Sequence, residues 1–190
     1  AVAHVTEGQV VAIDGKTLRR SYDRRSAKAA VHMVSAWATH KRVVLGQLKT
    51  EEKSNEITAI PELLKVLEIS GCIVTIDAMG CQKAIAQQIV EQEADYVLAL
   101  KQNHGTLYEA VAQQFHEARD TASEETPLQA YETEETQHGR VEIRRHWTLA
   151  APLALVQKDA WRQLCCLGRV ESERHLKGGG TIERGDYIAS

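Results

Sequence analysis

Features that would assign the chain to a membrane-spanning or repetitive class are missing from its 190 residues. No uninterrupted apolar stretch is long enough to cross a bilayer. The N-terminal segment AVAHVTEGQ has neither the charge nor the apolar run of a signal peptide. There is no internal repeat and no low-complexity tract. We therefore expect a soluble, cytoplasmic protein without a membrane partner.

Recognisable zinc motifs are absent as well. The cysteines, Cys72, Cys81, Cys165 and Cys166, form no C-x-x-C pair, and the histidines show no H-E-x-x-H spacing. Free cysteine is commonly buried in protein interiors. The thiols are therefore predicted to be reduced and structural, and most histidines to be structural or surface residues.

A strong excess of charge of either sign is also lacking, since the formal net charge is −3. This value alone does not indicate a nucleic-acid-binding protein, but the charges are unevenly distributed. Basic residues gather early in the chain, at Lys16, Arg19, Arg20, Arg24, Arg25 and Lys28, whereas residues 117–135 are rich in glutamate. A basic partner surface, if there is one, is expected beside Asp14.

Two aspartates that each follow a short apolar run are the clearest functional signal. Residues 10–13 (VVAI) lead into Asp14, and residues 73–76 (IVTI) lead into Asp77. Such runs are typical of buried β-strands, and Gly15 and Gly80 are taken to mark the strand ends. A carboxylate at a buried strand end is costly unless a cation meets it. If the two strands were neighbours, both carboxylates could bind one Mg²⁺ or Mn²⁺ ion.

The length suits one cored domain of α/β class. Periodicity predicts strands at 9–14, 31–38, 42–48, 72–77 and 95–100, and helices at 54–67, 82–92 and 107–118. The first three strands are expected to form an antiparallel meander. Pro61 is tolerated best in a first helical turn, so the first helix begins either at Ser54 or nearer Ile60.

The C-terminal third is predicted to be different in character. Residues 119–136 are acidic and weakly periodic, which indicates a surface linker. Residues 137–190 are predicted to form a β-rich insertion, with a strand at 141–149 and a hairpin around the glycines at 178–180. One face of that strand, with Val141, Ile143, Trp147 and Leu149, is expected to be buried. Trp37 and Trp147 are interpreted as core anchors rather than base-stacking platforms.

This order of elements is that of the ribonuclease H-like fold: a mixed five-stranded sheet with flanking helices and a β-rich insertion. In that fold the first and fourth strands are adjacent, which would bring Asp14 and Asp77 together. The segments AIDGKTLRRS, VSAW, KSNEITAIPELL, TIDAMGCQ, DYVLALKQN and HGRVEIR occur in this order. On these segments the chain resembles the DDE transposases of bacterial insertion sequences, specifically the H-repeat-associated branch.

The resemblance implies a DNA transposase catalytic core, with residues 1–118 as the ribonuclease H-like part. It implies metal-dependent strand cleavage and transfer by two Mg²⁺ (or Mn²⁺) ions held by three acids, of which Asp14 and Asp77 match the first two. The expected partners are the transposon ends and the target DNA, and a homodimer is one open arrangement.

The third acid of the family is a glutamate on a helix that follows the β insertion. Glu171, Glu173 and Glu183 are present, but they fall in the predicted hairpin. We therefore expect the chain to stop before that helix and to be inactive as a fragment. One alternative is an inactive remnant that binds DNA or a full-length transposase. Another is a ribonuclease H-like nuclease of a different family, which leaves the HGRVEIR and KSNEITAIPELL segments unexplained.

Candidate DNA-binding residues lie near the predicted acidic site and in the matching segments: Lys16, Arg19, Arg20, Lys101, Asn103, His138 and Arg140. Cationic side chains dominate affinity for DNA phosphates. The alternatives are a solvated charged loop for the first three residues, a helix start capped by Asn103, and a plain hairpin turn at residues 138–140.

Overall fold

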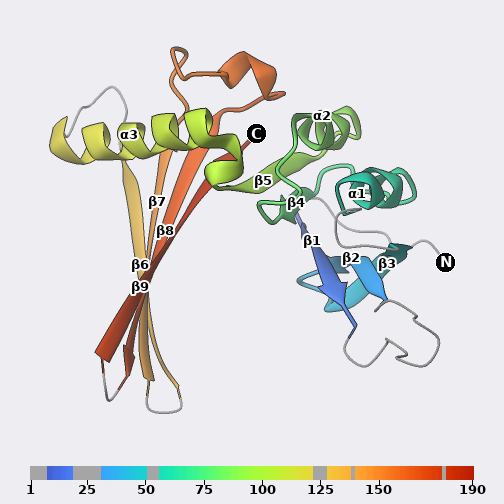
Figure 1. Cartoon of the computed structure of the whole chain (residues 1–190), viewed down its shortest axis with the longest axis horizontal. Helices are drawn as coiled ribbons and strands as arrows, with labels where there is room; N and C mark the ends of the chain where they lie inside the picture. Colours follow the sequence, from blue (N-terminus) through green and yellow to red (C-terminus); the bar gives the residue numbers. More distant parts are fainter. Residues whose placement is uncertain (1–7, 19–30, 51–55, 122–127, 138–139, 177–178) are drawn as a thin grey trace. The chain divides into compact units, whose positions relative to one another are not determined.

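A computed structural model of the chain describes residues 8–18, 31–50, 56–121, 128–137, 140–176 and 179–190 (Figure 1). It divides into two compact units, Ala1–Leu98 and Ala99–Ser190, here called the N-terminal and C-terminal units. The first unit contains β1 (Val10–Thr17), β2 (His32–Ala38), β3 (Val43–Thr50), α1 (Glu56–Lys65), β4 (Ile73–Ile76), α2 (Lys83–Glu91) and most of β5 (Asp95–Leu100). The second contains η2 (Gln102–His104), α3 (Gly105–Thr121), β6 (Gln129–Gln137), β7 (Arg140–Ala150), η3 (Lys158–Ala160), β8 (Cys166–Leu176) and β9 (Gly179–Ala189).

The sheet of the N-terminal unit has the strand order β3-β2-β1-β4-β5. β1 and β2, and β2 and β3, pair antiparallel, which confirms the predicted meander. β1 pairs parallel with β4, and β4 pairs parallel with β5. The predicted adjacency of the first and fourth strands is therefore correct, although the two are far apart in sequence.

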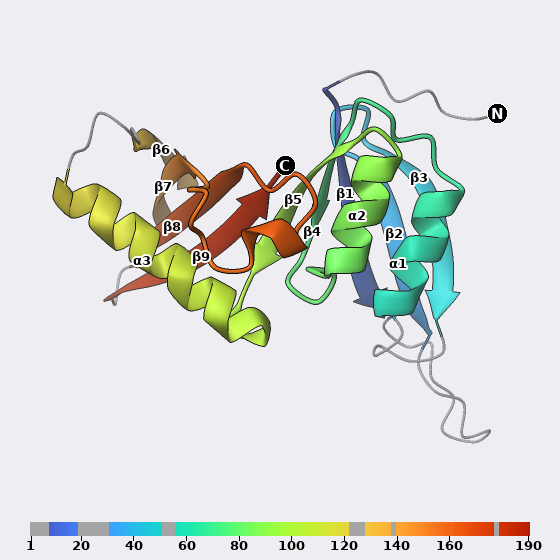
Figure 2. The same ribbon diagram turned by 90° about the horizontal axis from the view of Figure 1, so that it is seen from above.

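Two helices, α1 and α2, lie together on one face of this sheet (Figure 2). Alternate strand residues such as Val11, Val34 and Val74 are fully buried, as expected for a sheet with one covered face. α1 begins at Glu56, so Pro61 lies inside the helix rather than in its first turn. Its packing outweighs the backbone hydrogen bond that proline removes, because Ile60 and its neighbours Leu63 and Leu64 are buried. The expectation of a later helix start is wrong.

The C-terminal unit is an antiparallel sheet of strand order β9-β8-β7-β6 with α3 packed against it. Its core includes Leu107 and Phe115 from α3, Leu167 and Ile188 from the strands, and Trp161 from the β7–β8 connection. Trp37, in contrast, is 38% exposed, so its expected role as a core anchor is wrong. In the described part of the chain, none of the helices combines the length and apolar character needed to cross a bilayer.

The described residues form nine strands rather than the five of the predicted sheet. Four belong to the C-terminal unit, and one of these, β6, replaces part of the linker predicted at residues 119–136. The acidic composition suggested a solvated loop, but residues 129–137 pair with β7, and Glu132 faces an arginine on that strand. Arg145 on β7 lies opposite Glu132, and its Nε donates to that carboxylate at 2.7 Å. Cross-strand pairs of opposite charge stabilise such a strand.

Two further expectations need correction. β1 continues through Gly15 to Thr17, so Gly15 does not end the strand as predicted. On β7, only Leu149 of the four residues assigned to a buried face is fully buried, whereas Val141, Ile143 and Trp147 are half-buried. The alternation of apolar and polar residues in β7 identifies which side chains share a face of the sheet, but it does not show how deeply that face is buried.

Candidate active site

Asp14 and Asp77 each directly follow the last residue pair of the parallel strands β1 and β4. Ile13 pairs with Ile76, and each aspartate is the next residue along its strand. Both isoleucines are buried on the helix-covered face, while both aspartates are exposed. Since successive side chains alternate between faces, the two carboxylates share the open face and the same end of neighbouring strands.

The two carboxylates differ in their hydrogen bonding. Asp77 Oδ1 accepts bonds from the backbone N–H groups of Met79 at 3.1 Å and Gly80 at 3.4 Å. These bonds fix the orientation of the Asp77 carboxylate through Oδ1 and do not involve Oδ2. Asp14 makes no hydrogen bond or ion pair with the described residues. Such oxygen donors fit the preferences of Mg²⁺ and Mn²⁺.

The glycines near these aspartates allow other side chains to pack closely against the backbone. A Cβ built on Gly15 would lie 2.3 Å from the carboxyl carbon of Glu56, and one on Gly80 would lie 2.3 Å from Cγ2 of Ile76. No real Cβ tolerates such distances. Gly15 therefore lets Glu56 approach the backbone of β1, which is a recognised use of glycine within strands.

The candidate DNA-binding residues fall in three places. Lys16 is exposed on β1, two residues after Asp14 and hence on the same face of the sheet. Lys101 and Asn103 are exposed at the start of the C-terminal unit, where Asn103 lies inside η2. Arg140 begins β7. Three candidates, Arg19, Arg20 and His138, lie outside the described residues.

A pocket of about 390 Å³ in the C-terminal unit is lined by residues 99–103, Tyr108 and residues 184–187. Lys101 contributes a cationic group that is free of ion pairs within the described ranges. Arg184 also lines the pocket, but its guanidinium is held by Glu171 at 2.6 Å. Of the two cations in the lining, Lys101 is thus the one available to an incoming anion.

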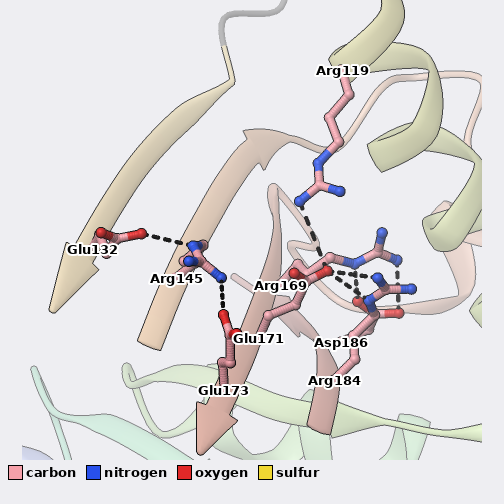
Figure 3. A network of polar contacts seen from close by, with 8 residues as sticks. All are labelled: Arg119, Glu132, Arg145, Arg169, Glu171, Glu173, Arg184 and Asp186. Atoms are coloured by element: carbon pink, nitrogen blue, oxygen red, sulfur yellow. Dashed lines mark hydrogen bonds and ion pairs between the residues drawn. The ribbon is translucent and has the colours of Figure 1, made fainter. Parts of the chain in front are cut away.

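The three candidates for a third acid are engaged elsewhere, and Figure 3 shows two of them, Glu171 and Glu173. Each is paired with an arginine of the same sheet: Glu171 with Arg184 at 2.6 Å, Glu173 with Arg145 at 2.8 Å, and Glu183 with Arg174 at 3.5 Å. Among the residues that the structure describes, no group of three histidine, cysteine or acidic side chains could hold a metal ion. Asp14 and Asp77 are thus a pair without a third carboxylate in the described structure.

These ion pairs also shift titrations in the C-terminal unit. Hydrogen bonds to Glu173 and then to Glu132 raise the pKa of Arg145. Desolvation alone would raise the pKa of Glu142, but the hydrogen bonds and charges of Arg144 and Arg174 lower it below its ordinary value. Arg144, Arg145 and Arg174 are therefore largely neutralised by neighbouring glutamates and contribute little free positive charge.

A buried polar pair in the N-terminal unit was missed by sequence reasoning. His32 on β2 and Glu56 at the start of α1 are 2% and 4% exposed, and Nε2 of the first lies 2.5 Å from Oε1 of the second. The only available sequence signal was Gly15, whose lack of a side chain inside a strand indicates close approach by another group. That signal was read as a strand end.

Comparison with known proteins adds independent information. The profile of the family described as Transposase DDE domain matches residues 6–152. The chain is 48% identical over 147 residues to "H repeat-associated putative transposase YhhI" of Escherichia coli K12, covering 77% of this chain and 38% of that protein. It is 49% identical over 142 residues to "Putative transposase YncI" of the same strain, covering 75% and 56%.

A protein encoded in the dhlA 3′ region of Xanthobacter autotrophicus is 44% identical over 180 residues, which is 95% of this chain and 59% of that protein. The chain thus spans between 38% and 59% of the length of these three curated relatives.

Proposed function

Because the chain belongs to the Transposase DDE domain family, we propose that it carries two of the three metal-binding carboxylates of a DNA transposase, Asp14 and Asp77. The reaction proposed is divalent-metal-dependent cleavage and transfer of DNA strands. The substrates proposed are transposon ends and target DNA. The strand order β3-β2-β1-β4-β5 supports a ribonuclease H-like core for this activity.

One observation supports this proposal most directly, namely the register of β1 and β4. The last parallel pair, Ile13 with Ile76, is followed on both strands by an aspartate on the open face. Two like charges side by side are unfavourable unless a cation lies between them. The helix-covered face supplies rigidity, and the open face supplies access for a long polymer such as DNA.

In the proposed reaction, divalent ions at this pair activate an attacking water or 3′-hydroxyl and stabilise the leaving oxygen. The in-line attack on phosphorus requires no covalent enzyme intermediate, so no cysteine or serine nucleophile is needed. The backbone amides of Met79 and Gly80 hold one oxygen of Asp77, which keeps the carboxylate oriented without neutralising it.

Lys16 and Lys101 are proposed to contact DNA phosphates. Lys16 shares the open face with Asp14, and Lys101 is the unpaired cation of the pocket in the C-terminal unit. Replacing either lysine by alanine should weaken DNA binding uniformly across sequences and reduce the slope of log K against log salt by about one. Lys65→Ala on α1, where the ammonium is paired with Glu62, is the matched control.

The metal site is tested by titrating Mn²⁺ into the 190-residue chain and measuring free Mn²⁺ by electron paramagnetic resonance. Asp14→Asn and Asp77→Asn should each abolish binding, whereas Asp95→Asn, at the other end of the parallel strands, should not. Binding that survives both substitutions, or a wild-type chain that binds no Mn²⁺, would refute the site.

We expect little strand cleavage or joining by this chain alone, because two carboxylates leave a second ion under-coordinated. Gel assays with Mg²⁺ or Mn²⁺ and duplexes carrying candidate ends would measure it. Robust cleavage that persists after substitution of Glu171, Glu173 and Glu183 would show that a third glutamate is not required. Specific DNA binding without Mn²⁺ binding would instead favour an inactive DNA-binding remnant.

A further inference from the structure

A polar cluster in which His32 and Glu56 are buried and Thr17 is exposed lies on the helix-covered side of β1, just beyond Asp14. It consists of Thr17, His32 and Glu56. Thr17 Oγ1 lies 2.9 Å from Nδ1 of His32, and Nε2 of His32 lies 2.5 Å from Oε1 of Glu56. Buried ionisable groups of this kind are costly and are often no more stabilising than apolar residues of the same volume. Global stability alone does not account for this cluster.

The cluster contacts the strand that carries Asp14. The Glu56 carboxyl group lies against the backbone of Gly15, where even a methyl group would come within 2.3 Å of it. Thr17 is two residues further along and pairs directly with His32 across the β1–β2 ladder. Asp14 points to the opposite face, so the cluster supports its strand from behind.

This part of β1 has less support than the rest of the strand. The parallel ladder with β4 ends at Ile13 and Ile76, so residues 14–17 are hydrogen-bonded along one edge only, to β2. Metal ligation requires a carboxylate held in one direction, and a strand end paired on one side twists easily. The Glu56 contact fills the helix-covered side of this strand end.

We propose that Glu56 is a positioning residue for Asp14: paired with His32, its carboxyl group fixes β1 at Gly15 and so directs the Asp14 carboxylate to the metal. This inference rests on the proposed function, in which Asp14 is a metal ligand. Glu56 does not itself bind the ion, because it belongs to the buried face and joins no metal-binding group of the described residues.

The test compares Mn²⁺ affinity among variants of the 190-residue chain, at equal folded fractions established by circular dichroism. Glu56→Ala should weaken Mn²⁺ binding by about tenfold to a hundredfold, the usual effect of removing a group that orients a metal ligand. Glu56→Gln keeps the shape of the side chain and its close approach to Gly15, so it should remain within about threefold of the wild type. Glu62→Ala, on the exposed side of α1, is the matched control.

A second readout is amide hydrogen exchange of residues 14–17. Glu56→Ala should accelerate exchange there and leave β4 unchanged, since the Glu56 carboxyl group lies against Gly15 of β1. Unchanged Mn²⁺ affinity in folded Glu56→Ala, with Asp14→Asn still abolishing binding, would overturn the inference and leave the proposed function intact. If Asp14→Asn did not reduce Mn²⁺ binding, the proposed function would be overturned, and the inference about Glu56 with it.

Gly15→Ala is an independent way to separate the Glu56 carboxyl group from β1, because the added methyl group must push Glu56 away. It should reproduce the loss of Mn²⁺ affinity in whatever fraction of the protein folds. Gly15→Ala combined with Glu56→Ala relieves the clash and should be no weaker in Mn²⁺ binding than Glu56→Ala alone. A double variant much weaker than that would assign the effect to Gly15 rather than to Glu56.

Discussion

The two units of this chain are stabilised by different means. In the N-terminal unit, a mixed sheet has one face covered by α1 and α2, and its interior is built from fully buried aliphatic side chains. In the C-terminal unit, long antiparallel strands carry arginine and glutamate in facing positions, as in the network around Glu171 (Figure 3). The first unit buries apolar surface, and the second pairs charges across strands.

This difference bears on function. Carboxylates that pair with arginines are poor metal ligands, and arginines that pair with carboxylates add little to DNA affinity. In the C-terminal sheet, Glu171, Glu173 and Glu183 are each paired with an arginine of the same sheet. Asp14 and Lys16, on the open face of the N-terminal sheet, make no ion pair with another described residue. The comparison assigns the proposed chemistry to the apolar unit rather than to the highly charged one.

The largest expected difference concerns the thiols. Burial raises the pKa of Cys81 in the N-terminal unit to about 12, whereas Cys165 in the C-terminal unit is exposed. At pH 8.5, iodoacetamide should label Cys165 on the order of a thousandfold faster, because only the thiolate reacts. Peptide mass mapping measures both rates, and labelling in denaturant is the control. Similar rates in the native protein would mean that Cys81 is accessible.

The same thiol also makes stability depend on pH. The folded-state pKa of Cys81 lies above the value of about 8.5 expected in the unfolded chain. The folded state therefore holds its proton more tightly, and the free energy of unfolding should fall as pH rises from about 8.5 towards 12. Cys81→Ser should flatten that part of the curve.

The next largest effect is expected from the buried ion pair of the C-terminal unit. Arg169 donates to both oxygens of Asp186, at 2.6 and 3.0 Å, and its guanidinium lies 4.6 Å from the centre of the Phe115 ring. Arg169→Ala should cost about 3–5 kcal/mol of unfolding free energy, because a buried carboxylate loses its partner. Urea denaturation measures this.

Two controls sharpen that measurement. Arg184→Ala breaks an exposed pair in the same sheet and should cost less than about 1 kcal/mol. Replacing Arg169 by Met and Asp186 by Leu together should recover most of the loss, since both charges leave the interior. A double variant as unstable as Arg169→Ala would show that shape, rather than charge, explains the effect.

In the N-terminal unit, Leu64→Ala is expected to cost about 2–5 kcal/mol, because the α1 side chain is fully buried and leaves a cavity. Val66→Ala, at a side chain that is 74% exposed, should change stability by less than about 0.5 kcal/mol. Thermal unfolding of both variants tests whether packing is the main source of stability here. Equal effects would contradict that view.

The smallest expected effect comes from Glu142. Its lowered pKa means that it stabilises the fold above its ordinary pKa of about 4.3, and that this contribution is lost as pH falls through the folded-state value. Glu142→Gln should therefore lower the melting temperature slightly at pH 7 and have no effect in strong acid. Adding 1 M NaCl should shrink the difference at pH 7. A salt-independent difference would point to packing instead.

Local pattern was sufficient for much of the N-terminal unit. Short Val- and Ile-rich runs and helical periodicity predicted the meander, and the likeness of the element order to the ribonuclease H-like fold predicted the adjacency of β1 and β4. These features depend on neighbours in sequence and on a few topological rules, so composition and spacing carry them. The placement of Asp14 and Asp77 on one face follows from the alternation of strand side chains.

Other features were decided only when distant residues met. β6 pairs with β7 along its whole length and places Glu132 opposite Arg145, although its own composition indicates a linker. Gly15 lies within β1, paired with Val34, and its missing side chain leaves room for Glu56, forty-one positions later. The energy of a charge or a glycine depends on what surrounds it, and the sequence order does not specify those surroundings.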